Sequence, residues 1–270
     1  YGKYLNEKAF SLLEYKNTAE TVPLNSEYTF ILGKAHHHLA LNNKNIEIQK
    51  MYLTKAMNCF SKSIALNGNY SKAYECLALT KDNLSRLNKT NLYSEIVCLF
   101  EKSMKLEPGN AYRISSYAKW LIQYDYEKSL LLYQQAMEKN PNIIISVIKD
   151  LRGYKNFSEI MSTIIPINHN SQALIFKSLN KYYGFNFAFN FIKKYIKSYY
   201  ENDCLMFWIA EKSVYTYRMP WSFSKYFYEK SISLNPLNFT NRIWYGIHLS
   251  EKKYYKEEDK IENVREWYNG

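Results

Sequence analysis

Glycine and proline are scarce in this chain of 270 residues, which holds eight glycines and six prolines. An all-β sandwich or barrel turns every eight to twelve residues and draws on these two residue types for its turns. The shortage therefore argues against an all-β fold and favours long helices. The chain also lacks an apolar run of eighteen residues, so we expect no membrane span within it.

Cysteine pairs are absent as well, because the four cysteines form no C-x-x-C motif and no spacing that suits zinc. Each cysteine lies inside an apolar helical pattern. We therefore expect all four to be buried small side chains, and they are Cys59, Cys76, Cys98 and Cys204.

Catalytic and metal-binding motifs are also absent. Three consecutive histidines, His36, His37 and His38, are the most conspicuous candidates. Successive side chains on a helix point about 100° apart and cannot converge on one ion, and the residue four after His36 is Ala40. We expect one histidine to face a groove and the others to pack or to be exposed. Since no phosphate-binding, hydrolase or zinc-protease motif occurs, we expect no metal, no cofactor and no catalysis.

The charge is strongly basic, with 36 Lys and Arg residues against 25 acidic ones and a formal net charge of +11. Such an excess attracts nucleic acid or anionic lipid. No uninterrupted basic block is present, and Lys193, Lys194 and Lys197 are interleaved with aromatic and aliphatic residues. A composition rich in Lys, Asn, Tyr and Ile also explains the excess without any ligand, and we favour that interpretation.

Four segments share one pattern, and they span residues 56–68, 96–108, 129–141 and 224–236. In each, a small or aliphatic residue is followed by an aromatic residue four positions on and a small residue three further, which marks one stripe of a helix. A Pro or Gly five residues later ends the helix. The triplets are Ala56, Phe60, Ser63; Ile96, Phe100, Ser103; Ser129, Tyr133, Ala136; and Ser224, Tyr228, Ser231.

This pattern resembles the second helix of the tetratricopeptide repeat (TPR). Phe100 and Tyr133 are 33 residues apart, close to the repeat length of about 34. First-helix patterns of a large residue and then an apolar–small pair precede three of the segments: Thr29, Leu32, Gly33; Tyr74, Leu77, Ala78; and Ile114, Tyr117, Ala118. The resemblance implies an all-α fold, a right-handed α-α superhelical solenoid of stacked antiparallel helix pairs.

The chain also departs from that pattern. Phe60 and Phe100 are 40 residues apart, so we expect enlarged links near Arg86–Leu92 and Asn42–Glu47. No repeat matches well between Tyr133 and Tyr228. There we expect helices at 142–151, 156–165, 171–183, 185–199, 203–217 and 220–234, separated at Gly153, Pro166, Gly184 and Pro220.

We expect a single TPR-like solenoid over residues 1–270. An N-terminal capping region (1–25) with a helix at 3–17 precedes three recognisable repeats (26–141). Degenerate hairpins (142–220) follow, and then a last repeat with a C-terminal cap (221–270) whose helix covers 257–268.

In the TPR family, positions 2, 5, 9 and 12 of each first helix line a concave groove. The resemblance therefore implies that the groove is lined by Glu27, Phe30, Lys34 and His37, by Lys72, Glu75, Leu79 and Asp82, and by Tyr112, Ser115, Lys119 and Ile122. The partner-binding set that we single out is Phe30, Lys34, His37, Lys72, Glu75, Leu79, Tyr112, Ser115 and Lys119. The family's clamp for acidic C-terminal tails is not expected, since its Asn residues are absent.

These features favour a non-catalytic scaffold or adaptor that binds a peptide or partner protein in its groove. The chain begins at Tyr1 rather than at methionine, so we expect further residues upstream. Strong repeats followed by weak ones resemble the soluble parts of bacterial envelope proteins that assemble polysaccharides, which leaves both a cytoplasmic and an envelope-associated location open.

The alternative is a nucleic-acid-associated protein. Residues 116–120 and 242–245 resemble the half-repeats of RNA-processing proteins, and the chain is basic and rich in aromatic residues. A third possibility, an enzyme, requires a buried cluster of titratable groups within 142–220, and the sequence indicates none.

Overall fold

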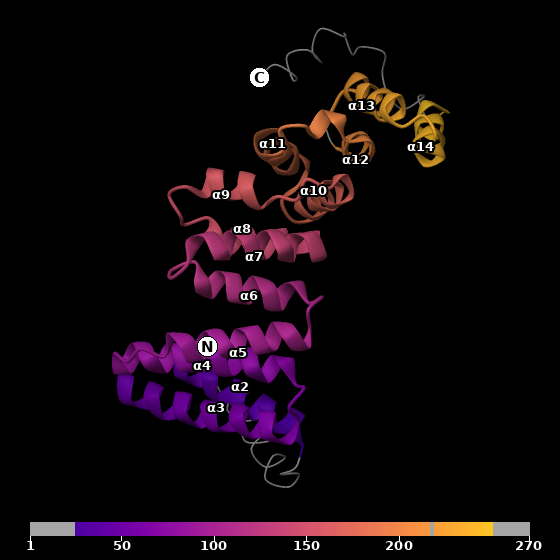
Figure 1. Ribbon diagram of the computed structural model, residues 1–270. Coiled ribbons are helices and arrows are strands. Elements are labelled where there is room, and N and C mark those ends of the chain that lie inside the picture. Colours follow the sequence, from indigo (N-terminus) through magenta and orange to yellow (C-terminus); the bar gives the residue numbers. More distant parts are fainter. Residues whose placement is uncertain (1–24, 217–218, 251–270) are drawn as a thin grey trace, which may run out of the picture. The chain divides into compact units, whose positions relative to one another are not determined.

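The computed structural model describes residues 25–216 and 219–250, and within these ranges every regular element is a helix (Figure 1). The chain divides into two compact units, Tyr1–Tyr117 and Ala118–Gly270, called unit 1 and unit 2 below. The prediction of an all-α fold is confirmed, and the capping helices expected at 3–17 and 257–268 lie outside the described residues.

Unit 1 is built from consecutive helices that pack against one another in chain order, α2 on α3, α3 on α4 and α4 on α5. Their bounds are α2 Ser26–Leu41, α3 Ile46–Leu66, α4 Ser71–Asn88 and α5 Tyr93–Leu106, and α6 (Ala111–Leu121) contains the division between the units. The starts of α2 and α3 follow from Asn25 and Asn45, whose side-chain oxygens accept hydrogen bonds from the first backbone N–H groups.

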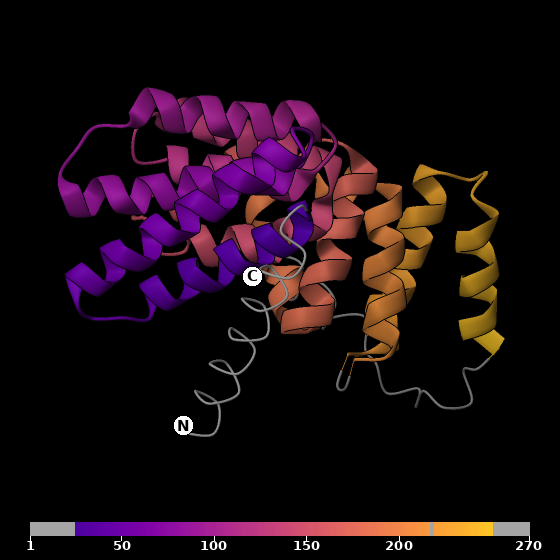
Figure 2. The same cartoon turned by 90° about the horizontal axis from the view of Figure 1, so that it is seen from below.

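Unit 2 continues the all-helical pattern. It contains α7 Tyr126–Lys139, η1 Pro141–Ile143, α8 Ile144–Leu151, α9 Phe157–Ile164, α10 His169–Tyr183, α11 Phe185–Tyr195, η2 Tyr199–Glu201, α12 Asp203–Val214, α13 Trp221–Leu234 and α14 Phe239–Ser250. Here α10 packs on α11, α12 on α13, and α13 on α14, and the orange and yellow helices in Figure 2 stand as neighbouring rods. The breaks expected at Gly153, Pro166, Gly184 and Pro220 all lie between helices.

The repeat motif forms the core. In all four segments the small or aliphatic residue, the aromatic residue and the following small residue are at most 2% exposed. In unit 1 the ring of Phe60 contacts Phe30, and the ring of Phe100 stacks on Tyr117 with centroids 5.0 Å apart. The aromatic residue thus fills the space between layers, as its place in the pattern predicts.

Gly33 shows why the first helix needs a small residue opposite that ring. A Cβ atom placed on Gly33 would lie 2.7 Å from Cε1 of Phe60, far inside van der Waals contact. A methyl group at this position could be accepted only if the fully buried ring of Phe60 shifted. Helix α2 can therefore approach α3 this closely only with glycine at position 33.

Serine hydroxyls join the second helix of a pair to the first turn of the first helix. Oγ of Ser63 donates to the carbonyl of Ser26 (2.8 Å), Oγ of Ser103 to that of Ser71 (2.9 Å) and Oγ of Ser231 to that of Asp203 (2.8 Å). Each acceptor is the first residue of its helix. In three of the four segments the last residue of the motif is therefore small for close approach and also carries a donor that fixes where the two helices meet, and in the third segment it is Ala136.

Two sequence expectations were wrong. Both links are shorter than expected, because α4 continues to Asn88 and α3 already begins at Ile46, so much of the extra length is helix. Cys98 is exposed, since it lies between Ile96 and Phe100, which turn inward, and so points to the opposite side of α5. The other three cysteines are partly buried.

We expect Gly33→Ala to destabilise unit 1 by about 1–3 kcal/mol, because the methyl group overlaps the ring of Phe60. The matched control is Gly246→Ala in α14, where nothing lies within 4 Å of the added Cβ. That change should stabilise its helix by up to about 1 kcal/mol, since alanine favours the helix over glycine. Urea unfolding of both variants measures the difference, and equal effects would contradict the proposed close approach.

We expect Ser63→Ala to lower the free energy of unfolding by about 1 kcal/mol relative to Ser61→Ala, because Ser63 donates to the partly buried carbonyl of Ser26. Both serines lie on α3, so the gain in helix propensity is the same, and Ser61 is exposed. Thermal unfolding followed by circular dichroism compares the two variants. Indistinguishable midpoints would show that the hydroxyl contributes nothing to the helix contact.

Candidate functional site

A hollow of about 350 Å³ opens between the two first helices of unit 1. It is lined by Lys34, His37, His38, Leu41 and Asn42 around α2, by Phe60 of α3, and by Cys76 and Leu79 of α4. We call it the first-helix hollow. Three residues of the predicted partner-binding set, Lys34, His37 and Leu79, are brought together here from segments more than 40 positions apart.

His37 forms a hydrogen-bonded bridge between α2 and α4. Its Nδ1 lies 2.7 Å from Oγ1 of Thr80, whose hydroxyl donates to the carbonyl of Cys76 (2.7 Å). Since the hydroxyl proton of Thr80 is already donated to Cys76, we assign a proton to Nδ1 of His37, which donates to Thr80. The unprotonated Nε2 of His37 then accepts from the amide of Asn83 at 3.5 Å. Burial and the neighbouring His38 lower the pKa of His37, so the ring is neutral at pH 7.

The thiol of Cys76 gives the hollow an unreactive apolar wall. Burial, reinforced by the nearby carboxylate of Glu75, raises the pKa of Cys76 to about 12. A thiol with such a pKa stays protonated at neutral pH and behaves as a small hydrophobic group. With Phe60, Leu41 and Leu79 it provides a surface suited to an apolar side chain.

Lys34 supplies positive charge at the rim. It is exposed, its Nζ lies 5.8 Å from the ring centroid of Phe30, and it makes no ion pair with any residue in the described ranges. The hollow therefore combines an apolar interior, the neutral His37 and a cation that an incoming carboxylate can reach.

Two members of the predicted set are buried and lie outside the groove surface. Phe30 is 6% exposed and packs between Phe60 and Tyr70, and the ring centroids of Phe30 and Tyr70 are 4.9 Å apart. Ser115 is also 6% exposed. The family numbering treats positions 5 of the first helices as groove-facing, but in α2 the ring at this position turns toward the next helix pair.

The remaining members lie apart from the hollow. Lys72 and Tyr112 are exposed, and the charge of Lys119 is engaged by Asp150 at 2.6 Å within unit 2. Glu75 forms an ion pair with Arg113 of α6, and both side chains are largely buried. The predicted partner-binding residues therefore do not form one continuous surface. Lys34, His37 and Leu79 line the first-helix hollow, and Glu75 belongs to a separate polar network.

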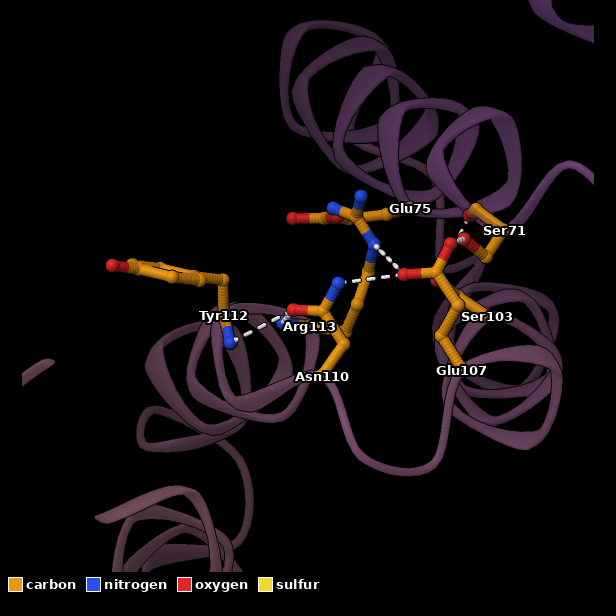
Figure 3. A network of polar contacts seen from close by, with 7 residues as sticks. All are labelled: Ser71, Glu75, Ser103, Glu107, Asn110, Tyr112 and Arg113. Atoms are coloured by element: carbon orange, nitrogen blue, oxygen red, sulfur yellow. Dashed lines mark hydrogen bonds and ion pairs between the residues drawn. The ribbon is translucent and has the colours of Figure 1, made fainter. Parts of the chain in front are cut away.

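That polar network connects α4, the end of α5 and the start of α6 (Figure 3). Glu107, the residue that ends α5, accepts hydrogen bonds from the hydroxyl of Ser71 and from the amide of Asn110 (2.6 Å). Nε of Arg113 lies 3.7 Å from the same carboxylate while its guanidinium also pairs with Glu75. The hydroxyl of Ser71 foremost, then Asn110 and Arg113, lower the pKa of Glu107.

The histidines do not converge. His36 stacks on Tyr52 with ring centroids 5.8 Å apart, His38 is exposed, and His37 bridges to α4. Among the described residues no group of three or more His, Cys, Asp or Glu side chains is placed to hold a metal ion. In the same part of the chain, no helix is long and apolar enough to cross a membrane.

The fold defines a class, namely an all-α array of TPR-like antiparallel helix pairs with the repeat motif buried. No protein-family model matches the chain, and no curated protein matches its sequence. One similar solved structure is YrrB, a TPR protein with an unusual peptide-binding site, which is 12% identical over 85% of this chain and 96% of YrrB, with a TM-score of 0.37.

Another similar solved structure is yeast Tom70, which is 13% identical over 97% of this chain, with a TM-score of 0.32. The chain spans 62% of the length of Tom70.

We expect Ser71→Ala to raise the pKa of Glu107 toward the usual glutamate value, because its largest stabilising hydrogen bond is lost. A lowered pKa means that Glu107 stabilises unit 1 above the unfolded pKa, and this contribution is lost as the pH falls through the folded value. The variant should therefore lose less stability on acidification than the wild type. Carboxyl NMR titration measures the pKa, and Ser94→Ala, an exposed serine on α5, is the control.

An unchanged pKa of Glu107 in the Ser71→Ala variant would contradict the assigned cause. The carbonyl of Ser71 is retained in this variant, so the hydrogen bond from Ser103 remains and the helix contact is not disturbed.

Proposed function

We propose that the chain is a non-catalytic scaffold whose first-helix hollow binds a segment of a partner protein. The observation that carries the proposal is the convergence of Lys34, His37 and Leu79 on one hollow of about 350 Å³ between α2 and α4. A space of this size accepts one bulky side chain of a peptide lying across the first helices.

The chemistry of the hollow favours a peptide that carries an apolar side chain and a nearby carboxylate. Cys76, Leu79 and Phe60 offer apolar contact, and burial of a Leu or Phe side chain contributes about 1.5–3 kcal/mol. Lys34 supplies a charge for the carboxylate. His37 adds no charge at neutral pH but holds α2 and α4 at a fixed separation through Thr80.

The location of such a scaffold in an envelope protein that assembles polysaccharides stays a prediction from the sequence. The gene sequence upstream of Tyr1 tests it: transmembrane helices there support an envelope role, and a further run of repeats contradicts it.

Panning a phage-displayed library of random 12-residue peptides on the whole chain tests the binding proposal. Peptides selected on the wild type should be enriched in acidic and bulky apolar residues. We expect these peptides to bind Lys34→Glu about tenfold more weakly than the wild type, a difference of about 1.4 kcal/mol.

The matched control is Lys62→Glu, which reverses an exposed lysine on α3, outside the hollow. It carries the same change in net charge and should leave affinity unchanged. A library that yields no peptide able to distinguish Lys34→Glu from Lys62→Glu would overturn the proposed site.

A further inference from the structure

A row of aromatic rings runs along one side of α11 in unit 2. Tyr183 at the end of α10 contacts Phe187 (ring centroids 4.6 Å apart), Phe187 contacts Phe191 (6.3 Å) and Phe191 contacts Tyr195 (4.6 Å). The ring of Phe157, the first residue of α9, meets Tyr195 edge-on at 6.3 Å. We call these five rings the aromatic row.

The row lies beside a pair of short helices and is partly exposed. Helices α8 and α9 have eight residues each, whereas α10 has 15 and α11 has 11. Beside the short pair lies a hollow of about 460 Å³, which we call the aromatic hollow. It is lined by the aromatic row together with Ile148, Arg152, Asn190 and Lys194. Phe187 is 42% exposed here, although its neighbour Phe191 is buried.

The charge around the aromatic hollow is one-sided. Its lining contains Arg152 and Lys194 and no acidic residue, and neither cation makes an ion pair with a described residue. Residues 149–197 hold eight Lys and Arg residues against two acidic ones, Asp150 and Glu159, and Asp150 is engaged by Lys119. The rest of unit 2 holds thirteen of each sign, so the whole positive excess of this unit falls on the segment that forms the hollow.

We propose that the aromatic hollow is a second docking site, which binds an acidic segment of a partner protein through a bulky apolar side chain. The side chain enters between Phe157, Phe187 and Phe191, and flanking carboxylates meet Arg152 and Lys194. Aromatic surfaces give a bulky side chain contact area, and guanidinium and ammonium groups pair with carboxylates.

A single-stranded nucleic acid is the alternative ligand for the aromatic hollow, because it also combines negative charge with flat rings. Its bases carry several donors and acceptors on their edges, and these lose free energy when they are buried without partners. Besides the two cations, the polar groups of the hollow are the amide of Asn190 and the hydroxyls of Tyr183 and Tyr195, too few for the edges of successive bases. The rings of the row also contact one another instead of standing apart to stack between bases. An apolar side chain leaves no such group unpaired, so the geometry favours a peptide.

The test uses fluorescein-labelled peptides and the whole chain, with binding followed by fluorescence anisotropy. The probe is a peptide pool in which two positions taken from Leu, Phe and Trp are flanked by two Asp residues on each side. Three comparison probes isolate its features: Ala at the central positions, Lys at the flanking positions, and an oligo-dT strand. We expect the acidic apolar pool to bind at least tenfold more tightly than all three.

Two variants locate the site. Arg152→Glu combined with Lys194→Glu reverses the cations, and Phe187→Ser removes an exposed ring without opening the core. Each should weaken binding of the acidic pool by about tenfold or more. The matched controls are Lys181→Glu and Tyr182→Ser, an exposed lysine and a 65% exposed ring on α10 outside the hollow, which should leave binding unchanged.

The outcomes separate the alternatives. Binding of the acidic pool that is equally weak for the wild type and the Phe187→Ser variant overturns the proposal. So does tighter binding of oligo-dT that is lost in the Arg152→Glu, Lys194→Glu variant, since this assigns the hollow to nucleic acid. Because the acidic pool also suits the first-helix hollow, all probes and variants are compared in the Lys34→Glu background, so failure of one site is distinguishable from failure of the other.

Discussion

The structure depends on the close approach of the two helices of a pair, which in three of the four repeat segments is fixed by the serine that ends the motif in the second helix. Ser63, Ser103 and Ser231 are fully or almost fully buried, and each donates to the carbonyl of the first residue of the preceding first helix. A larger side chain would separate the helices, and alanine would allow the approach without fixing it. The residues that end the second helices extend the contact, since Glu107 accepts from Ser71 and the amide of Asn235 donates to Asp203 (2.9 Å). These hydrogen bonds hold one side of the first helix against its partner helix. The other sides of the first helix can then contact the next helix pair or a ligand.

The repeat was predictable because the constraints that create it are local. A small residue, an aromatic residue four on and a small residue three further occupy one helix stripe, and every such triplet is buried as the pattern predicts. The breaks at Gly184 and Pro220 were predictable for the same reason, and Gly184 adopts a positive φ of 84° between α10 and α11. The serine hydrogen bonds were not predicted, since the pattern indicates size but does not identify a partner 28 to 37 residues away.

The candidate site was predictable in part, and the failures have a physical cause. Lys34, His37 and Leu79 line one hollow as the family positions imply, whereas Phe30 is buried, because its position on α2 faces the ring of Tyr70. Whether a given position of a first helix is exposed in the groove depends on the size of the side chain that faces it from the next repeat. The position number within one helix does not contain this information. The aromatic row was visible in the sequence as Tyr183, Phe187, Phe191 and Tyr195 at intervals of four, but a helical stripe of this kind predicts a core. In the structure Tyr183 and Phe187 instead lie partly at the surface, beside the eight-residue helices α8 and α9.

The degenerate repeats contain the proposed second docking site. Phe187 and Tyr183 are 42% and 40% exposed there, beside the cations Arg152 and Lys194, and each ring forgoes the free energy that complete burial would contribute. The net charge of the whole chain does not reveal this local excess of positive charge, because a total of +11 over 270 residues is explained by composition alone. Counted by segment, the excess of unit 2 coincides with the stretch in which the repeat pattern fails. A degenerate repeat pattern, exposed rings and an excess of positive charge therefore occur in the same residues. These features are expected where part of a helical array is less well packed because it forms a binding site.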